Sequence, residues 1–329
     1  MTAHSRGDFV GLGAQLLGGV GVALAARPGA KPAAAGRLPG VVSLRDTGAV
    51  GDGRKDDTAA IRRAFKRLGE LRHGGILYAP PGEYITRGGH VLRPWTQLVG
   101  AGVGTTLFRH VGAGSCFTLT GPGITEHRAG IGELSIQGGS APGAAGVEFR
   151  DLSFGAWARN VRVRDYKAGI GFLLNNFASR QYNEGVMLVN CSSTNCATGI
   201  TLRRVGGTES FKGFFTSQFG CNVPAGGRGF DFGVGGELPI LVYNCELHGH
   251  IWFDRNENNI GWDVGARALL RDGSAWISGE GSSKTSVSIR NRAGGQVALF
   301  GQWWFNQIPH AADLSRTKIG PLTSASLGV

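Results

Sequence analysis

The feature that most constrains the fold of this chain is a repeated unit of two short apolar segments joined by a small polar turn. The units recur about every twenty to thirty residues, a spacing typical of stacked coils. In such a stack each coil buries its apolar side chains against its neighbours, so the repeat predicts a solenoid of short strands. The clearest units begin at Val161, Val186, Thr216 and Ile240.

The composition agrees with a chain of many short strands. Of the 329 residues 57 are glycines and 41% are hydrophobic, which is too apolar for a disordered chain. Glycines scattered among short apolar runs indicate many tight turns. Further strand-like segments precede and follow the clearest units. We therefore expect one domain over residues 40–310, with residues 311–329 as a tail or an end cover.

Aligning the four units places two sets of residues in equivalent positions. Cys191, Cys221 and Cys245 share one register, which predicts a buried ladder of reduced cysteines packed as small apolar side chains. A reactive cysteine is the alternative. The residues at the equivalent sharp turns are of types that tolerate a left-handed backbone. These turn residues are Asp165, Asn190, Gly220 and Asn244.

Residues 1–35 have a different character and predict an export segment. A weakly apolar stretch over residues 9–26 follows a basic start, and small-residue patterns typical of signal cleavage lie at residues 23–25 and 33–35. The start also resembles the twin-arginine export motif, but Gly7 stands where the second arginine belongs, so the route stays open. We expect a secreted or periplasmic protein with no stable membrane insertion after signal removal. An uncleaved anchor is the alternative.

The acidic stretch from Asp52 to Asp57 is the first candidate for a functional loop. A calcium loop would need oxygen ligands at alternate positions that end in a glutamate, and the sequence does not supply them. From Asp57 to Leu71 the apolar residues share one helical face. We therefore expect Asp56 or Asp57 to cap an amphipathic helix and the stretch to be structural.

Three segments near the start of the domain together form a recognisable signature. They are residues 46–65 (DTGAVGDGRKDDTAAIRRAF), 74–85 (GGILYAPPGEYI) and 97–107 (QLVGAGVGTTL). This signature resembles the N-terminal part of the pectate-lyase-like superfamily, which includes polygalacturonase-related hydrolases, glucanases and phage tailspike modules. The resemblance implies an all-β fold, a single-stranded right-handed parallel β-helix with an N-terminal capping α-helix over the open end of the coils. The signature carries no catalytic residues.

The net charge indicates the chemical class of the partner. The chain carries a formal charge of +11, which suits an acidic partner, although a basic surface can also serve only to keep a protein solvated. The sequence lacks zinc-finger spacing, long basic runs and the signature of an RNA-binding sheet, so a nucleic acid is not expected. A polysaccharide, and in particular an acidic one, is the expected partner.

No cofactor or metal is expected from the sequence. The five cysteines match no zinc spacing. Glu246, His248 and His250 alternate along one strand, and a His-x-His pair suits a metal, but no third ligand is evident. An exposed polar strand face is the favoured interpretation of this segment.

Alternation along the strands predicts which side chains point outward. In residues 228–233 the two phenylalanines should point inward and leave Asp231 outside. The same reasoning turns His250, Trp252 and Asp254 outward from a later strand, and Arg203 outward from an earlier one. Stacking these strands would place them on one outer face, where a carboxylate pair, an arginine and an aromatic ring suit sugar binding and cleavage.

A polar segment over residues 175–185 interrupts the repeat and is the second candidate site. Arg180, Tyr182 and Glu184 lie in it, and polar loops on a rigid scaffold often carry function, although a solvated loop is an equal alternative. The predicted catalytic residues are therefore Asp231, Asp254 and Glu184. The predicted substrate-binding residues are Arg203, Trp252, Arg180 and His250.

Three functions remain compatible with the sequence. The first is an exported polysaccharide-cleaving enzyme, a glycoside hydrolase that uses a carboxylate pair on the outer face of the β-helix. The second is a polysaccharide lyase acting on uronate-containing polymers, with an arginine as base and basic residues that neutralise the substrate carboxylate. The third is a non-catalytic glycan-binding or adhesion β-helix. The oligomeric state stays open.

Overall fold

The computed structural model describes most of the chain after residue 39, and all described residues belong to one compact unit, Pro39–Val329. The described ranges are 40–121, 128–139, 141–152, 155–178, 183–207, 210–233, 240–253, 258–264, 267–279, 287–291, 296–305 and 317–319. The predicted export segment lies outside them, as do Arg180 and Asp254. Within these ranges no helix is long and apolar enough to cross a membrane.

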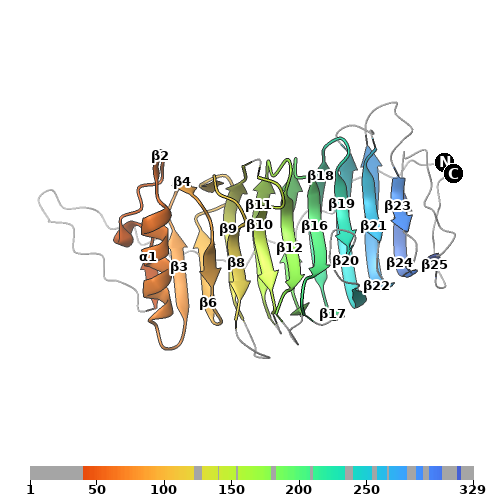
Figure 1. The fold of residues 1–329 in the computed structure, drawn as a ribbon, viewed down its shortest axis with the longest axis horizontal. Helices are drawn as coiled ribbons and strands as arrows, with labels where there is room; N and C mark the ends of the chain where they lie inside the picture. Colours follow the sequence, from red (N-terminus) through yellow and green to blue (C-terminus); the bar gives the residue numbers. More distant parts are fainter. Residues whose placement is uncertain are drawn as a thin grey trace, which may run out of the picture. The chain divides into compact units, whose positions relative to one another are not determined.

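The α-helix α1 (Thr58–Gly69) lies at one end of a stack of strands (Figure 1). Its apolar face, which includes Ile61, Ala64 and Leu68, is buried and lies against β1 (Val41–Ser43) and β3 (Gly75–Ala79). A short 3-10 helix, Arg45–Thr47, also contacts α1. The predicted capping helix is therefore confirmed.

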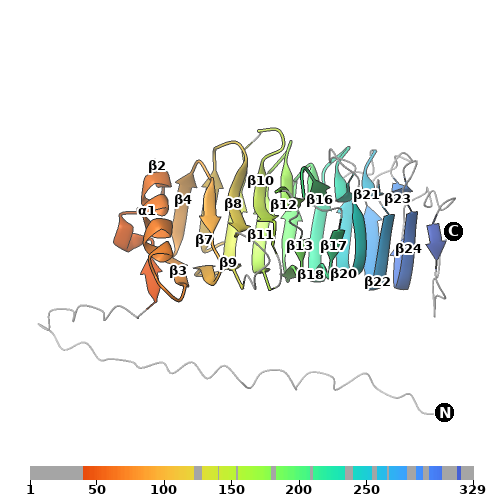
Figure 2. The ribbon, with the colours of Figure 1, turned by 60° about the horizontal axis from the view of Figure 1, so that its bottom comes forward.

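Strands of successive coils lie side by side in chain order, and all of the pairings are parallel (Figures 1 and 2). Each coil contributes strands to three faces, which are called the first, second and third in the order in which the chain passes through them. The third face is an eight-stranded sheet of β5 (His90–Leu92), β8 (Ser115–Thr120), β10 (Ala145–Arg150), β12 (Ile170–Asn176), β16 (Thr198–Arg204), β19 (Arg228–Phe232), β21 (Ile260–Val264) and β23 (Val287–Asn291). This arrangement confirms the predicted parallel β-helix.

The first and second faces belong to one bent sheet of seventeen strands. Besides β1 and β3 it contains β2 (Asp52–Asp56), β4 (Gly82–Thr86), β6 (Thr96–Gly100), β7 (Thr106–His110), β9 (Gly130–Gln137), β11 (Trp157–Arg164), β13 (Asn183–Glu184), β14 (Met187–Val189), β15 (Ser192–Thr194), β17 (Ser210–Lys212), β18 (Phe215–Val223), β20 (Leu241–Phe253), β22 (Arg267–Gly279), β24 (Gln296–Phe305) and β25 (Thr317–Ile319). In β9 and β11 the first half pairs on the first face and the second half on the second face. Parallel pairing reaches β25, beyond residue 310.

Polar residues with left-handed backbones make the bend between the first and second faces. Glu133, Asn160 and Asn190 have φ angles of 57°, 52° and 49° and occupy equivalent positions on successive coils. Their side chains form a ladder, in which Asn190 Nδ2 donates to Asn160 Oδ1 at 2.7 Å and Asn160 Nδ2 donates to Glu133 Oε1 at 2.5 Å. The bend thus uses side-chain hydrogen bonds to offset the cost of the left-handed conformation.

A second ladder follows the second face, and it corrects the predicted register of the turns. Asp165 and Asn195 are equivalent, with φ angles of 64° and 56°, and Asn195 Nδ2 donates to Asp165 Oδ1 at 2.8 Å. The prediction that Asp165 and Asn190 are equivalent is wrong, because each of these two coils has two polar turns and the alignment matched the second turn of one to the first turn of the other.

A glycine column on the third face allows the coils to pack closely. It includes Gly146, Gly171, Gly199, Gly229 and Gly261. A Cβ atom at Gly199 would lie 2.5 Å from Cys221 Sγ and 2.6 Å from the Gly229 carbonyl oxygen. Only glycine fits at such a position without displacing backbone.

Four cysteines of the described part of the chain, Cys116, Cys191, Cys196 and Cys221, are buried thiols that form no disulfide there, as expected for reduced core residues. The predicted common register of Cys191, Cys221 and Cys245 is wrong. Cys221 pairs with Ser193 and Ile251, and Cys245 pairs with Leu270. Strand register follows the whole hydrogen-bonded ladder, so local similarity around a cysteine does not determine it.

Candidate functional site

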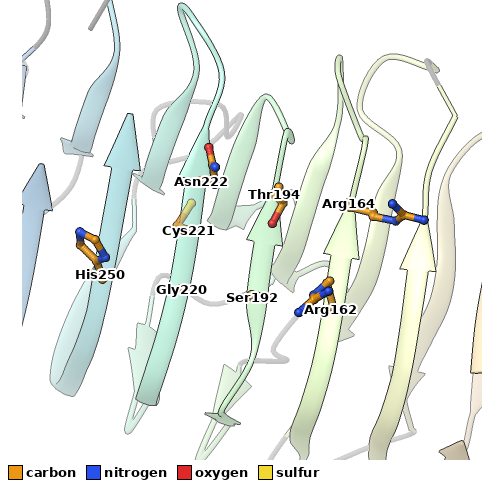
Figure 3. Close-up of a pocket in the computed structure, with 8 residues that line it drawn as sticks. All are labelled: Arg162, Arg164, Ser192, Thr194, Gly220, Cys221, Asn222 and His250. Carbon is orange, nitrogen blue, oxygen red and sulfur yellow. The ribbon is translucent and has the colours of Figure 1, made fainter. Parts of the chain in front are cut away.

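A depression of about 440 Å³ crosses the outer side of the second face (Figure 3). It spans four consecutive coils, because its residues come from β11, β15, β18 and β20. The lining residues are Arg162, Arg164, Ser192, Thr194, Gly220, Cys221, Asn222 and His250.

The strand register arranges most of these residues in two rows across the coils. The first row pairs Arg162 with Ser192, Ser192 with Gly220, and Gly220 with His250. Since Gly220 has no side chain, a hollow remains between Ser192 and His250, where an added Cβ would meet only Ser192 Cβ at 3.7 Å. The absence of a side chain in mid-row therefore gives the depression its depth.

The second row runs parallel to the first, two residues further along each strand. It pairs Arg164 with Thr194, Thr194 with Asn222, and Asn222 with Trp252. The Oδ1 atom of Asn222 is buried and has no hydrogen-bond partner among the described residues, which leaves an acceptor beside the depression. Arg164 Nη2 donates to Gln137 Oε1 at 3.1 Å, and this contact holds the guanidinium at the edge of the row.

The depression is basic, because two of its eight lining residues are arginines and none is acidic. Partial burial of the imidazole lowers the pKa of His250 below its ordinary value, so the ring is mostly neutral at pH 7. A neutral imidazole can accept a proton, and a guanidinium can bind a carboxylate through paired hydrogen bonds. The hydroxyls of Ser192 and Thr194 supply further donors and acceptors.

The spacing of the rows indicates an extended ligand. Arg162 and His250 are three strands apart, which corresponds to roughly 14 Å at the usual separation of neighbouring strands. One sugar cannot contact both side chains. A polymer that runs across the coils can, with its successive units over successive strands.

The predicted outer-face cluster is wrong, because its members lie on different faces. Arg203 and Asp231 belong to β16 and β19 of the third face, whereas His250 and Trp252 belong to β20 of the second face. The strand that follows β19 on the third face is β21, where Asp263 pairs with Asp231.

Sequence analysis missed Asp263, although a signal for it exists. The segments Gly-Phe-Asp-Phe-Gly at 229–233 and Gly-Trp-Asp-Val-Gly at 261–265 share one pattern. Matching these two segments would have placed the two aspartates on adjacent coils. Arg162 and Arg164 were also missed, even though they alternate with the buried residues Val161 and Val163.

Asp231 and Asp263 form a buried ionic cluster rather than an open carboxylate pair. Asp231 is 2% exposed and Asp263 is 0% exposed. Arg228 Nε lies 2.9 Å from Asp263 Oδ2, and Arg228 Nη1 lies 3.7 Å from Asp231 Oδ2. Two buried carboxylates that share a cation stabilise the stacking of coils and are closed to a polymer, so the predicted catalytic role of Asp231 has no geometric support.

The remaining predicted residues do not form a site together in the described structure. Glu184 is half-buried in β13, and its backbone N–H donates to the Leu152 carbonyl. Arg203 is half-buried beside Asn175, and its Nε has no hydrogen-bond partner. The side chain of Trp252 is not among those that the structure describes. Of the predicted residues, His250 lines the depression.

A further buried carboxylate, Glu148 on β10, stabilises the fold. It is 1% exposed and accepts two hydrogen bonds from Arg150, both at 2.8 Å, with others from Asn175 and Ser115 at 2.9 and 2.7 Å. Burial alone would raise the pKa of Glu148, but these hydrogen bonds outweigh it and lower the pKa. Among the described residues no group of three His, Cys, Asp or Glu side chains could hold a metal.

Comparison with known proteins places the N-terminal part of the chain in a family. Residues 41–136 match the family described as rhamnogalacturonase A/epimerase, pectate lyase-like. Alginate lyase 7 of Azotobacter vinelandii is 36% identical over 108 residues, which are 29% of this chain and 12% of that protein. Mannuronan C5-epimerase AlgE6 of the same organism is 34% identical over 156 residues, 40% of this chain and 17% of that protein. The chain therefore spans less than a fifth of these relatives.

Among solved structures, the A-module of mannuronan C-5 epimerase AlgE6 from Azotobacter vinelandii aligns over 86% of this chain and 99% of that module. The identity is 15% and the TM-score is 0.43. The family match covers the capping helix and the first coils, and parallel coils of the same kind continue to β25. Residues 41–136 thus match a pectate lyase-like family, and the fold of the described chain is the parallel β-helix that the resemblance to the pectate-lyase-like superfamily implied.

Proposed function

We propose that this protein binds a uronate-containing polysaccharide along the depression of the second face and acts on it as a lyase or a C5-epimerase. The observation that carries the proposal is the composition of the depression. It offers two arginines, a neutral histidine and hydroxyl and amide groups over four coils, with no acidic side chain among its lining residues. Such a surface attracts carboxylates on a polymer and repels none.

The two reactions share their first step. A base removes the proton at C5 of a uronate, next to the carboxylate, and the electrons move towards that carboxylate. In a lyase the bond from C4 to its oxygen then breaks, the departing oxygen takes up a proton, and an unsaturated sugar remains. In an epimerase a proton returns to C5 from the opposite side. Neither reaction consumes water, so neither needs the carboxylate pair of a glycoside hydrolase.

Each described residue has a role in this proposal. His250 accepts the C5 proton, for which its lowered pKa suits it at neutral pH. Arg162 and Arg164 bind carboxylates of units further along the polymer and fix its register. Ser192, Thr194 and Asn222 bind the hydroxyls of the sugars between them.

The curated relatives support the same substrate class. The names of two of them, an alginate lyase and a mannuronan C5-epimerase, refer to lyase and C5-epimerase chemistry on a polysaccharide. A glycoside hydrolase, the first function predicted from the sequence, loses the support of Asp231, which is buried with Arg228. We also retain the proposal of export, which cell fractionation of the native host would test.

The experiment is incubation of the purified protein with alginate, polygalacturonate and a neutral β-glucan. We expect either new ultraviolet absorbance from an unsaturated product or a changed ratio of uronate epimers by proton NMR, with an acidic polymer only. New reducing ends without absorbance, or activity on the neutral polymer alone, would contradict the proposal.

Matched variants connect the activity to the depression. Arg162→Gln should raise KM by about tenfold or more, since a charged hydrogen bond contributes roughly 1.5–3 kcal/mol. Arg159→Gln is the control, because Arg159 is an exposed arginine of the same strand that lies before the bend, outside the depression. His250→Gln should lower kcat with little effect on KM. Equal effects of the two arginine changes would exclude the depression as the binding site.

A non-catalytic glycan-binding protein is the second candidate function. The arginines, hydroxyls and amide that line the depression are sufficient to bind a glycan without any chemistry. Retention on an alginate column without any product, with retention lost in Arg162→Gln, would favour this function over catalysis.

A further inference from the structure

A separate cavity of about 400 Å³ lies between α1 and β5, at the capped end of the β-helix. Its rim carries three exposed cationic side chains, Arg62 and Lys66 on α1 and Arg93 after β5, and one carboxylate, Glu70. In the part of the chain that the structure describes, none of the three cations has an ion-pair partner. The rim is therefore an unneutralised basic cluster.

His90 lines the same cavity but is 2% exposed. Its ring packs against two aromatic rings, since that of Phe65 stacks on it at 5.6 Å and 7° and that of Phe117 lies at 5.6 Å and 35°. Its Nε2 is 2.6 Å from Thr86 Oγ1. The remaining polar atom, Nδ1, is buried and has no hydrogen-bond partner among the described residues. His90 thus brings one unsatisfied polar atom to the lining of the cavity.

The hydrogen bonds of the Thr86 hydroxyl determine which ring nitrogen of His90 carries the proton. The Thr86 hydroxyl oxygen already accepts from the Gly88 N–H at 3.1 Å. If the hydroxyl donates to His90 Nε2, its own proton is satisfied and the imidazole proton lies on Nδ1. The other tautomer would leave both the hydroxyl proton and Nδ1 without partners, because the described residues provide the hydroxyl no other acceptor.

The charge of the ring is also determined. Burial, with further contributions from Arg62 and His110, lowers the pKa of His90 to about 3, so the ring is neutral at physiological pH. Neutral His90 then carries a buried N–H donor without an acceptor, an arrangement that costs free energy unless a ligand supplies the acceptor.

We propose that this cavity is an oxyanion-binding site, in which the Nδ1–H of His90 donates to a carboxylate or phosphate oxygen and Arg62, Lys66 and Arg93 neutralise its charge. The site is distinct from the depression of the second face, and the proposal does not depend on the function proposed for that depression. The ligand is an anionic group small enough for the cavity, either the carboxylate of an acidic saccharide or a phosphate.

The test uses the full-length protein and needs no disruptive variant. Long-range proton–nitrogen NMR of labelled protein should show His90 as the Nδ1–H tautomer. Glucuronate or inorganic phosphate should move the Nδ1–H resonance downfield, whereas glucose should not. Shifts with both anions identify a general oxyanion site, and a shift with one identifies the preferred source. The Nε2–H tautomer, or no shift with either anion, would overturn the proposal.

Variants of the rim give a second measurement. Arg62→Gln and Lys66→Gln change exposed side chains, so both should fold, and each should weaken anion binding by tenfold or more in calorimetry. Arg67→Gln is the control, because Arg67 lies on α1 but does not line the cavity. Binding that is unchanged in both rim variants would also overturn the proposal.

Discussion

Asp57 allows a direct test of how the start of the domain is held together. Sequence analysis predicts a helix cap, and the structure assigns its carboxylate a different contact. Asp57 is 1% exposed, and its two oxygens accept hydrogen bonds from the backbone N–H groups of Val50 (2.7 Å) and Gly51 (2.9 Å). The carboxylate therefore ties the preceding loop to the start of α1, while Asp56, which precedes the N-cap residue, accepts from the N–H of Thr58 at 2.9 Å and so caps the first N–H of the helix.

The two roles differ in magnitude. A hydrogen bond to a charged group contributes roughly 1.5–3 kcal/mol, so loss of two at Asp57→Ala should lower the free energy of unfolding by about 3 kcal/mol. Loss of the cap at Asp56→Ala should cost about 1 kcal/mol. Asp52→Ala is the control, because Asp52 is exposed and accepts only from its neighbours Arg54 and Lys55.

Urea denaturation of the purified variants measures these differences. The midpoint should fall most for Asp57→Ala, less for Asp56→Ala and least for Asp52→Ala, with unchanged slopes if unfolding stays two-state. Activity of folded Asp57→Ala on a polysaccharide should equal that of the parent protein. An Asp57→Ala effect no larger than that of Asp56→Ala would refute the structural argument, and loss of activity in the folded variant would refute the scaffold role.

Three further predictions concern the interior. Gly199→Ala should destabilise the protein by roughly 1–3 kcal/mol, because the added methyl group overpacks against Cys221 Sγ and a backbone carbonyl. Gly69→Ala, in α1, should stabilise the protein by up to about 1 kcal/mol, because the added Cβ meets no neighbouring atom within 4 Å. Thermal melting of the two variants measures this difference. Glu148→Gln should cost roughly 3–5 kcal/mol at pH 7. Because the folded-state pKa of Glu148 is lowered, its contribution is complete above its ordinary value of 4.5 and is lost as the pH falls through the lowered pKa, so the gap between variant and parent in pH-dependent unfolding should narrow in acid. Burial raises the pKa of Cys191 to about 12, so native protein at pH 8 should react with iodoacetamide far more slowly than denatured protein, and equal rates would contradict the burial.

The candidate site could be predicted from the sequence only in part. His250 was identified because it alternates with buried residues along one strand. Its neighbours in the depression, Arg162 and Arg164, come from a strand nearly ninety residues earlier in the chain. Their proximity depends on how many coils separate them and on the register of each ladder, and a shift of one residue would turn both arginines inward.

The carboxylates show the same limit. Alternation correctly separates Asp231 from the phenylalanines on either side, but it gives no information on what covers the outer side of the third face. Burial of Asp231 with Asp263 and Arg228 arises from contacts between adjacent coils. The sequence contains the matching pattern around residues 229–233 and 261–265, yet the prediction aligned Asp231 with a strand of another face.

The sequence by itself determined the class of fold, the capping helix and the core. Periodicity of apolar residues within each strand and helix is a local property, and so is the N-terminal family signature. Only the tertiary structure decided which strands share a face, which polar turns are equivalent on successive coils, and that a basic depression rather than a carboxylate pair lies open on the outer side. The physical reason is that coil length varies from unit to unit, from 25 to 32 residues between successive glycines of the third-face column. Lateral register is therefore fixed by backbone hydrogen bonds and packing between coils, which the local pattern of residues does not encode.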